Sequence, residues 1–447
     1  MSRGAGRGRP SDLREVWRII KPRRGRGLLS LLLASLSLIC AIGLIATSAW
    51  LISRAWQQPP ILYLTVAVVA VRAFGLGRGV FRYSERLVSH SAALRGLTDL
   101  RVRLVERVAV VAPAGMRGMR RGDALRRLVD DVDASAEFGL RTVLPGATAV
   151  VVGAAVIGLV CWLVPLGAVV LLVGLLLAGV VAPWVTARVG RAAAGEQVHL
   201  KGRLAGDLTS LLGQSTDVIA ANAVSERTQT IRDLDAQILA AESQTARGMG
   251  LSAAIGAAAQ GLALIGIVLV AVPAVQSGQL NGVNLAVVVL IPLVAFEIVS
   301  GLPSAALWLA KAQASSQRIV ELLARSDPVP DPVTVERGGG GDVGGNRGEP
   351  MLEVSDVAVT WPGSDRAAVS GVTFRLRFGE RIGVVGPSGC GKSSLAAGLV
   401  KFAPVTGSVQ LGGIDYERLS GDEVRGIIGY CEQDAHIFDN TIAENIR

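Results

Sequence analysis

Long stretches without a charged residue dominate the first 300 positions of the chain. Between them lie segments in which apolar and charged residues recur with a helical spacing. About 20 helical residues cross the ~30 Å hydrocarbon core of a bilayer, so one such run predicts one span and a run twice as long predicts two. The uncharged or nearly uncharged runs are residues 27–53, 61–80, 142–187 and 248–296.

The two longer runs each contain a break that predicts a hairpin of two spans. Trp162 and Pro165 lie near the middle of the first, and Pro273 and the turn-like residues 277–282 lie within the second. Prolines and turn residues inside an apolar run indicate a reversal of the chain. With the two shorter runs, the total is six spans. The alternative is a water-soluble helical bundle, which does not easily bury uncharged runs of this length.

The two shorter runs are read as one span each. A signal peptide has an apolar core of about 7–15 residues, and the run 27–53 is too long for that. It is therefore expected to stay in the membrane. The run 61–80 is weaker because Arg72 and Arg78 interrupt it.

Basic residues cluster where the positive-inside rule places the cytoplasm. The formal net charge is +9, and residues 1–27 carry +7 of it. The long connections 84–141 and 188–247 are helical in pattern and rich in Arg, whereas the short loops between them contain one basic residue, Arg54. Both termini are therefore expected in the cytoplasm. The charge excess marks topology and contact with membrane lipid, and it does not indicate a nucleic-acid partner.

The composition fits a membrane protein whose own cysteines are expected to be reduced thiols. Half of the residues are hydrophobic and 18% are charged, against about 25% charged in soluble domains, which excludes a purely soluble or disordered chain. The cysteines are dispersed and form no C-x-x-C pair, so no disulfide framework is expected. They are Cys40, Cys161, Cys390 and Cys431.

The pattern changes after about residue 325. A Pro/Gly-rich stretch, 326–349, predicts a flexible linker. Short apolar alternations then predict strands at residues 351–354, 357–361, 372–376 and 381–385. The expected domains are a basic N-terminus (1–27), a membrane domain (28–325), the linker (326–349) and a nucleotide-binding region (350–447).

The strongest motif is a complete G-x-x-x-x-G-K-S phosphate loop. It follows the predicted strand 381–385 and precedes the helix-like residues 394–400, and this context argues against a glycine-rich turn formed by chance. Backbone N–H groups of such a loop surround phosphates, Lys392 would reach the β- and γ-phosphates of ATP, and Ser393 would bind Mg²⁺. The expected nucleotide-binding residues are Gly386, Pro387, Ser388, Gly389, Cys390, Gly391, Lys392, Ser393 and Ser394.

Six spans with long inner helices, followed by this loop, resemble an ABC exporter half-transporter. Trp361 lies 25 residues before Gly386, where that family places an aromatic that stacks on adenine, usually Tyr; an edge-strand aromatic is the alternative. Gln433 resembles the Q-loop glutamine, which implies contact with Mg²⁺ and the attacking water. The resemblance thus implies ATP hydrolysis with Lys392 and Gln433 as catalytic residues. The implied fold is a six-span exporter membrane domain followed by an α/β P-loop domain.

The printed sequence ends at Arg447, a few residues after Gln433. No stretch resembling the family's signature motif, its Walker B strand with the catalytic glutamate, or its switch histidine occurs before that point. From the resemblance, the chain as printed is expected to hold a partial nucleotide-binding domain. It would bind nucleotide weakly and would not hydrolyse ATP alone.

Residues 79–90, Gly-Val-Phe-Arg-Tyr-Ser-Glu-Arg-Leu-Val-Ser-His, carry a finer resemblance. They are similar to the corresponding stretch of the CydC subunit of the CydDC thiol-reductant exporter family, with Ser84 in place of Leu. The resemblance implies a heterodimer with a CydD-like half-transporter in the cytoplasmic (inner) membrane. It also implies export of cysteine or glutathione, support of cytochrome bd assembly, and a link to haem.

The same stretch places basic side chains on one stripe of a helix. Arg78, Arg82, Arg86 and His90 recur every four residues. One reading is contact with lipid headgroups. The sharper reading is a site for an anionic cargo or for haem, with Arg86 clamping a carboxylate and His90 as an axial ligand. A hydrogen-bonded structural histidine is the alternative for His90.

Two further hypotheses concern charged residues of the membrane half. Arg72 lies deep in its span, where an unpaired charge is costly, and Glu297 in the sixth span is its candidate partner. Residues 122–133 resemble the inner loop that docks on nucleotide-binding domains in the family. A solvated charged helix explains their composition equally well, so no site is assigned there.

Three functions remain open from the sequence. The first is an ATP-driven thiol exporter subunit. The second is the same machine with another cargo, such as haem, lipid, drug or peptide. The third is a non-transporting membrane protein that senses ATP.

Overall fold

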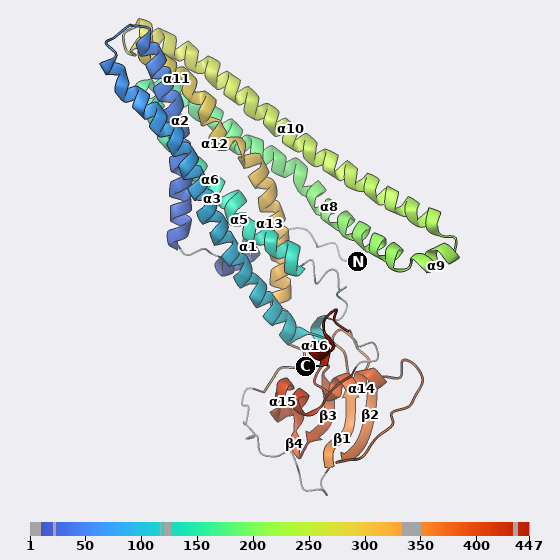
Figure 1. Cartoon of the computed structure of the whole chain (residues 1–447). Helices are drawn as coiled ribbons and strands as arrows, with labels where there is room; N and C mark the ends of the chain where they lie inside the picture. The colour runs from blue at the N-terminus through green and yellow to red at the C-terminus, as the bar shows by residue number, and fades with distance from the viewer. Residues whose placement is uncertain are drawn as a thin grey trace. The chain divides into compact units, whose positions relative to one another are not determined.

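The computed structural model describes residues 10–20, 24–116, 119, 127–332, 350–431 and 437–446. The chain divides into two compact units, each of which is described by itself (Figure 1). The first unit is helical, and the second holds a β-sheet with short helices. They comprise Met1–Leu104 with Arg121–Glu321, and Val105–Arg120 with Leu322–Arg447.

Among the described residues, six helical segments are long and apolar enough to cross a membrane. Their number and the two hairpins confirm the prediction from the uncharged runs. Each of these segments has the length and the apolar composition that a membrane span requires. The segments are Gly25–Ala55, Leu62–Val111, Arg127–Leu163, Pro165–Gly190, Val224–Gln276 and Gly282–Leu323.

A short amphipathic helix, α1 (Pro10–Ile20), precedes the first span. Val16 and Ile20 are buried and Trp17 is half-buried, whereas the intervening charged side chains face outward. The basic composition of residues 1–27 concealed this helix. Its signal is nevertheless present, because Leu13, Val16, Trp17 and Ile20 follow the i, i+3, i+4, i+7 spacing of one helical face.

Helices α2 (Arg24–Ala55) and α3 (Leu62–Val111) form the first hairpin. They meet where Gly43 faces the ring of Phe74, since a Cβ on Gly43 would lie 2.9 Å from that ring. The small residue on α2 thus leaves room for the large side chain on α3.

The second hairpin joins α6 (Leu144–Leu163) to α7 (Pro165–Leu176). Val164 between them is extended, with φ −148° and ψ 96°. Pro165 is the first residue of α7, where its missing N–H has no intrahelical partner to lose. The reversal expected from Trp162 and Pro165 therefore occurs at this position.

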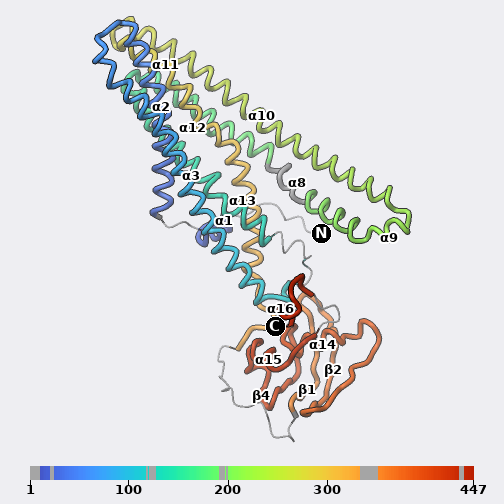
Figure 2. Tube along the Cα trace, in the orientation of Figure 1, coloured from blue at the N-terminus to red at the C-terminus, as the bar shows by residue number. Residues whose placement is uncertain are grey.

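Two long helices, α8 (Ala182–Gly213) and α10 (Val224–Gln276), pack side by side and extend past the other helices of the first unit (Figure 2). The short helix α9 (Ser215–Ala220) connects them. Pro273 does not end α10 as expected. The helix continues for three residues because Ser277 donates its N–H to the Pro273 carbonyl at 2.9 Å.

The last span consists of α11 (Gly282–Ala295), α12 (Glu297–Ser300) and α13 (Leu302–Leu323). Asn281 caps α11 by accepting a hydrogen bond from Val283 N. The core of the unit lies between α6, α7, α10 and α11, with fully buried Val152, Leu171, Ile267 and Val288. The remaining short elements are η1 (Ala114–Met116), η2 (Arg127–Asp131), α5 (Val132–Phe138), η3 (Gly139–Val143) and η4 (Leu177–Val181).

The second unit contains an antiparallel sheet with strand order β2-β1-β3-β4. The predicted strands 351–354 and 357–361 form a single strand, β1, with a bulge at Asp356, whose φ is +47°. Gly407 faces the bulge, and a Cβ there would lie 2.3 Å from the Asp356 carbonyl oxygen. The strands are β1 (Pro350–Val359), β2 (Val369–Arg377), β3 (Val405–Leu411) and β4 (Ile414–Asp415).

The predicted strand 381–385 is wrong, because these residues form no strand. They reach the phosphate loop as an extended segment without a ladder partner among the described strands, and Val385 is 92% exposed. A strand requires a neighbour that accepts its hydrogen bonds, which local apolar character does not supply.

Helices and one short turn complete the second unit. Helix α14 (Lys392–Leu399) packs its Leu395 and Ala397 into the core of the sheet. Ser420 and Glu423 form a capping box at the start of α15 (Gly421–Ile427). The other elements are η5 (Tyr416–Arg418) and α16 (Ile442–Ile446).

Candidate functional site

The G-x-x-x-x-G-K-S loop forms a tight turn that ends at the N-terminus of α14. Gly389 and Gly391 have φ angles of +84° and +100°, a region that favours glycine. A Cβ on Gly391 would also lie 2.3 Å from the carbonyl oxygen of Ala368. Backbone conformation and space therefore both require glycine at position 391, where the loop crosses the chain that leads into β2.

Lys392, the first residue of α14, folds back over the loop. Its Nζ donates to the carbonyl oxygens of Gly386 at 2.8 Å and of Pro387 at 3.0 Å. The loop leads directly into the N-terminus of α14, where the helix dipole favours an anion. This arrangement can bind phosphate oxygens, with Lys392 exchanging its carbonyl partners for them.

Trp361 contacts the first turn of α14, directly after the loop. Its indole Nε1 donates to Ser394 Oγ at 3.0 Å, and the side chain packs at the edge of the sheet's core. The half-buried ring is held beside the helix that follows the loop. This contact joins two of the predicted residues, while the stacking of Trp361 on adenine stays a prediction.

The loop residues from Gly386 to Cys390 are exposed, so the phosphate side of the loop is open. Cys390 Sγ lies 3.8 Å from Lys392 Nζ. Gln433 lies outside the described residues, and its predicted contact with Mg²⁺ has no structural account. Within the described part of the chain, no group of three or more His, Cys, Asp or Glu residues is arranged to hold a metal ion. A magnesium ion would instead be held jointly by Ser393 and the nucleotide.

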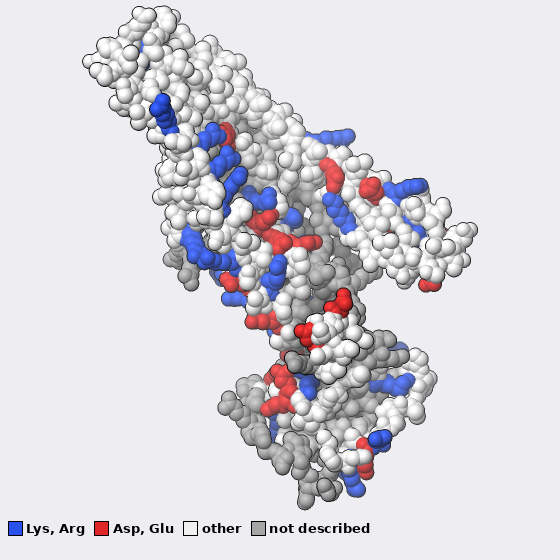
Figure 3. All heavy atoms as spheres, viewed as in Figure 1, with Lys and Arg blue, Asp and Glu red and all other residues white. Residues whose placement is uncertain are grey.

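The basic stripe of α3 forms a second cluster in the membrane unit. Figure 3 shows Lys and Arg side chains following this helix along one face. Arg82, Arg86 and His90 are exposed, and Arg78 is half-buried. His90 Nδ1 lies 3.0 Å from the Arg86 carbonyl oxygen, a contact that fits an Nδ1–H donor and leaves Nε2 as the atom able to bind a ligand.

Glu297 pairs with Arg78, not with Arg72 as predicted. Arg78 Nη2 donates to the two carboxylate oxygens of Glu297 at 2.8 and 3.2 Å. Arg78 lies six residues beyond Arg72, roughly 9 Å further along the helix. The register of α3 against α12 therefore decides the pairing, and sequence spacing alone does not contain that register.

The sequence also concealed a buried charge pair. Asp131 is 3% exposed and binds the guanidinium group of Arg318 in α13. The sequence interpretation left residues 122–133 as a docking loop or a solvated helix, without a site. No signal in the sequence alone identifies Asp131, because its neighbours Asp130 and Asp133 have the same chemistry.

Comparison with known proteins agrees with this architecture. Residues 369–446 match the family described as ABC transporter. The chain is 30% identical over 429 residues to the glutathione/L-cysteine transport system ATP-binding/permease protein CydC of Escherichia coli (strain K12), covering 94% of this chain and 72% of that protein. It is 25% identical over 425 residues to the CydC protein of Haemophilus influenzae (strain ATCC 51907 / DSM 11121 / KW20 / Rd), with the same two coverages.

A third relative extends the likeness to a protein named CydD. The chain is 28% identical over 459 residues to the glutathione/L-cysteine transport system ATP-binding/permease protein CydD of Bacillus subtilis (strain 168), covering 97% of this chain and 75% of that protein. These matches include both the helical unit and the phosphate loop. The likeness thus extends over the six membrane-crossing helices and the ATP-binding motif of one chain. The chain belongs to the ABC exporter family of CydC- and CydD-type ATP-binding/permease proteins.

Proposed function

We propose that this chain is the CydC-like subunit of a heterodimeric exporter that uses ATP to move cysteine or glutathione across the cytoplasmic membrane. In this proposal the partner is a CydD-like half-transporter, and the exported thiols support cytochrome bd assembly. The names of the relatives support the cargo class. The positive-inside charge pattern supports an N-terminus and a nucleotide-binding unit in the cytoplasm.

The observation that carries the proposal is the phosphate loop, formed with Lys392 across its mouth on a chain with six membrane-crossing helices. The loop fits a nucleotide: its residues from Gly386 to Cys390 are exposed, and only glycine is accommodated at position 391. Lys392 would hold the β- and γ-phosphates, and Ser393 would hold Mg²⁺. Trp361 would stack on adenine, and Gln433 would orient the attacking water.

The cargo site is proposed on the basic stripe of α3. Glutathione and cysteine carry carboxylates, which guanidinium groups bind with paired hydrogen bonds. Arg82 and Arg86 are exposed on this face and free to meet a ligand from the side that the rest of the unit leaves open. Their spacing of one helical turn matches a ligand with more than one anionic group.

Haem is a second candidate ligand of the same stripe. His90 can present Nε2 while Nδ1 is held by the Arg86 carbonyl oxygen, and Arg86 can pair with a propionate. Haem would supply an iron that takes an imidazole nitrogen as axial ligand. In this arrangement Arg86 and His90 would bind and orient the group.

The proposal is tested in vesicles that contain the complete transporter, assembled with its partner subunit. We expect glutathione and cysteine to stimulate ATP hydrolysis and to accumulate in inside-out vesicles. Lys392→Ala should abolish both effects, and Lys201→Ala, an exposed lysine of the helical unit, should change neither. Accumulation of haem without accumulation of thiols would overturn the thiol cargo, and ATP hydrolysis without accumulation of any cargo would favour a sensor.

A further inference from the structure

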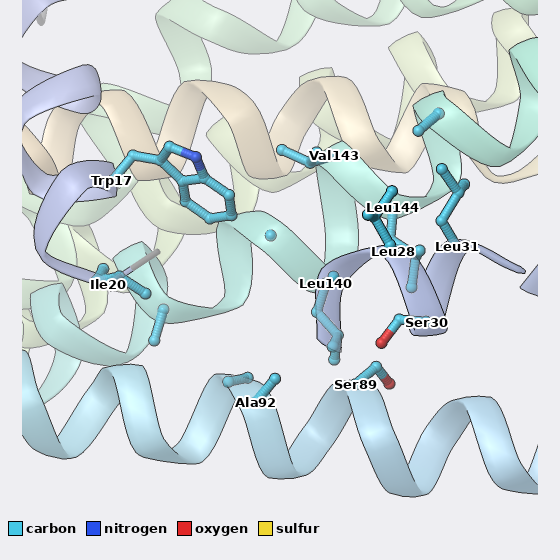
Figure 4. A pocket seen from close by; sticks show the side chains of 15 residues that line it. Trp17, Ile20, Leu28, Ser30, Leu31, Ser89, Ala92, Leu140, Val143 and Leu144 are labelled. Atoms are coloured by element: carbon cyan, nitrogen blue, oxygen red, sulfur yellow. The ribbon is translucent and has the colours of Figure 1, made fainter. Parts of the chain in front are cut away.

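A partly open apolar pocket lies in the helical unit. Its volume is about 450 Å³, within the range of sites that bind small organic molecules. Its walls come from α1, the start of α2, the middle of α3 and the segment α5–η3–α6. Figure 4 shows Trp17 and Ile20 of α1 facing Leu140 and Val143 across it.

The pocket offers few polar side-chain groups to a ligand: the indole N–H of Trp17 and two hydroxyls. Only Ser30 and Ser89 of the lining carry side-chain hydroxyls, and both donate to their own helices. Ser30 Oγ donates to the Arg26 carbonyl at 3.0 Å, and Ser89 Oγ donates to the Arg86 carbonyl at 3.3 Å. The group that fills the pocket is therefore hydrocarbon, because a polar group there would lose its hydrogen bonds to water.

Helix α1 indicates the depth in the membrane at which a hydrocarbon group would enter the pocket. Helix α1 has one buried apolar face and exposed Arg14 and Arg18, the pattern of a helix that lies in the membrane interface. The pocket wall formed by α1 would therefore lie at the boundary between the headgroups and the acyl chains of the membrane lipids. A ligand can enter there without crossing water.

Three basic residues are sequence neighbours of lining residues, on three elements. Arg18 follows the lining residue Trp17, Arg26 precedes Gly27, and His90 follows Ser89. The acidic neighbour Glu137 is already paired with Arg141, whose Nε lies 2.9 Å from its carboxylate. Arg18 and Arg26 thus place positive charge within one residue of the lining on α1 and α2, which attracts an anionic headgroup at about 1 kcal/mol for each basic side chain near the surface.

We propose that this pocket binds one acyl chain of an anionic phospholipid, with the phosphate attracted by Arg18 and Arg26. The inference rests on the proposed topology, which puts α1 in the cytoplasmic leaflet. It does not depend on the cargo, and the experiment measures lipid binding without transport. Failure here and failure of the thiol-export proposal are therefore distinguishable.

The test uses the complete transporter in lipid nanodiscs and phospholipids with brominated acyl chains, which quench a nearby indole. The chain has seven tryptophans, so the signal of Trp17 is taken as the difference between the unaltered protein and Trp17→Phe. We expect brominated phosphatidylglycerol to quench this signal with a roughly tenfold preference over brominated phosphatidylcholine, as the charges of Arg18 and Arg26 imply. Equal quenching by the two lipids would overturn the proposal.

A pocket-filling variant supplies the second arm. Ala92→Phe places a ring in the pocket and should reduce the phosphatidylglycerol-specific quenching of Trp17 by about fivefold or more. Ala73→Phe, on an exposed position of the same helix, should leave it unchanged. If Ala92→Phe does not fold, competition by unlabelled phosphatidylglycerol in the unaltered protein decides instead. Relief of quenching by added haem or oleate but not by unlabelled phosphatidylglycerol would overturn the proposal.

Discussion

Arg318 binds Asp131 through two parallel hydrogen bonds, from Nε to Oδ2 at 2.7 Å and from Nη2 to Oδ1 at 2.5 Å. Ser315 Oγ donates to the same carboxylate at 3.1 Å. The residues lie 187 positions apart, and the pair joins η2 to the last turns of α13. The buried carboxylate therefore locks the start of the third span to the end of the sixth.

Removing the carboxylate should leave the Arg318 guanidinium partly buried without its counter-charge. We expect Asp131→Asn to lower the free energy of unfolding by about 2–4 kcal/mol. This loss is smaller than that for breaking a fully buried pair, because 23% of the Arg318 side chain is exposed. The matched control is Asp133→Asn, whose pair with Arg101 is about half exposed on both sides and should cost less than ~1 kcal/mol. Equal losses in thermal unfolding of the two variants would contradict the lock.

The two glycines with positive φ in the phosphate loop should respond differently to alanine. Gly391→Ala meets the Ala368 carbonyl and should lower the affinity for ATP by about tenfold or more. Gly389→Ala has open space around its Cβ and bears only the left-handed backbone cost of about 1–2 kcal/mol. Titration with a fluorescent ATP analogue measures both affinities. A smaller loss for Gly391→Ala than for Gly389→Ala would contradict this account of the loop.

The ion pair between α3 and α12 should show thermodynamic coupling. Arg78→Ala and Glu297→Ala are each expected to destabilise the helical unit, and the double variant should lose less than their sum by ~1 kcal/mol or more. Exchanging the charges, Arg78→Glu with Glu297→Arg, should restore much of the loss. Arg72→Ala combined with Glu297→Ala provides the contrast and should be additive. Thermal unfolding in detergent measures each variant, and coupling of Glu297 to Arg72 would contradict the observed pairing.

The capping box of α15 predicts a pH dependence of stability. The backbone N–H and then the hydroxyl of Ser420, both bonded to the carboxylate, hold the pKa of Glu423 below its usual value. The folded-state pKa therefore lies below the unfolded value, so the stabilisation is fully present above the unfolded pKa of about 4.3 and is lost as pH falls through the folded pKa. Urea unfolding followed by tryptophan fluorescence should show this acid loss, and Glu423→Gln should remove it.

The control for this prediction is Glu417→Gln, at an exposed position that caps nothing with its side chain. This variant should keep the loss of stability as pH falls below the unfolded pKa of about 4.3. A loss of equal size in Glu423→Gln would show that another group causes it.

Sequence alone identified the spans, because a bilayer demands apolar length and charges mark its edges. It also identified the phosphate loop, because Gly391 and Lys392 act through local backbone geometry. It failed where the deciding contact is distant along the chain. Residues 381–385 have the composition of a strand but pair with none of the described strands. Glu297 forms its ion pair with Arg78 because of the register of α3 against α12. The pocket beside Trp17 depends on four segments meeting, which no local pattern encodes.

The ion pair of Arg78 and Glu297 has a consequence for biogenesis. Arg78 leaves the ribosome 219 residues before its counter-charge. At about 5–20 residues per second, synthesis takes roughly 10–40 s to deliver the partner. Until then Arg78 lacks the counter-charge that it has in the folded unit, and an unpaired charge within a membrane span is costly. The final pairing of the second span therefore depends on a segment that is synthesised last in the membrane domain.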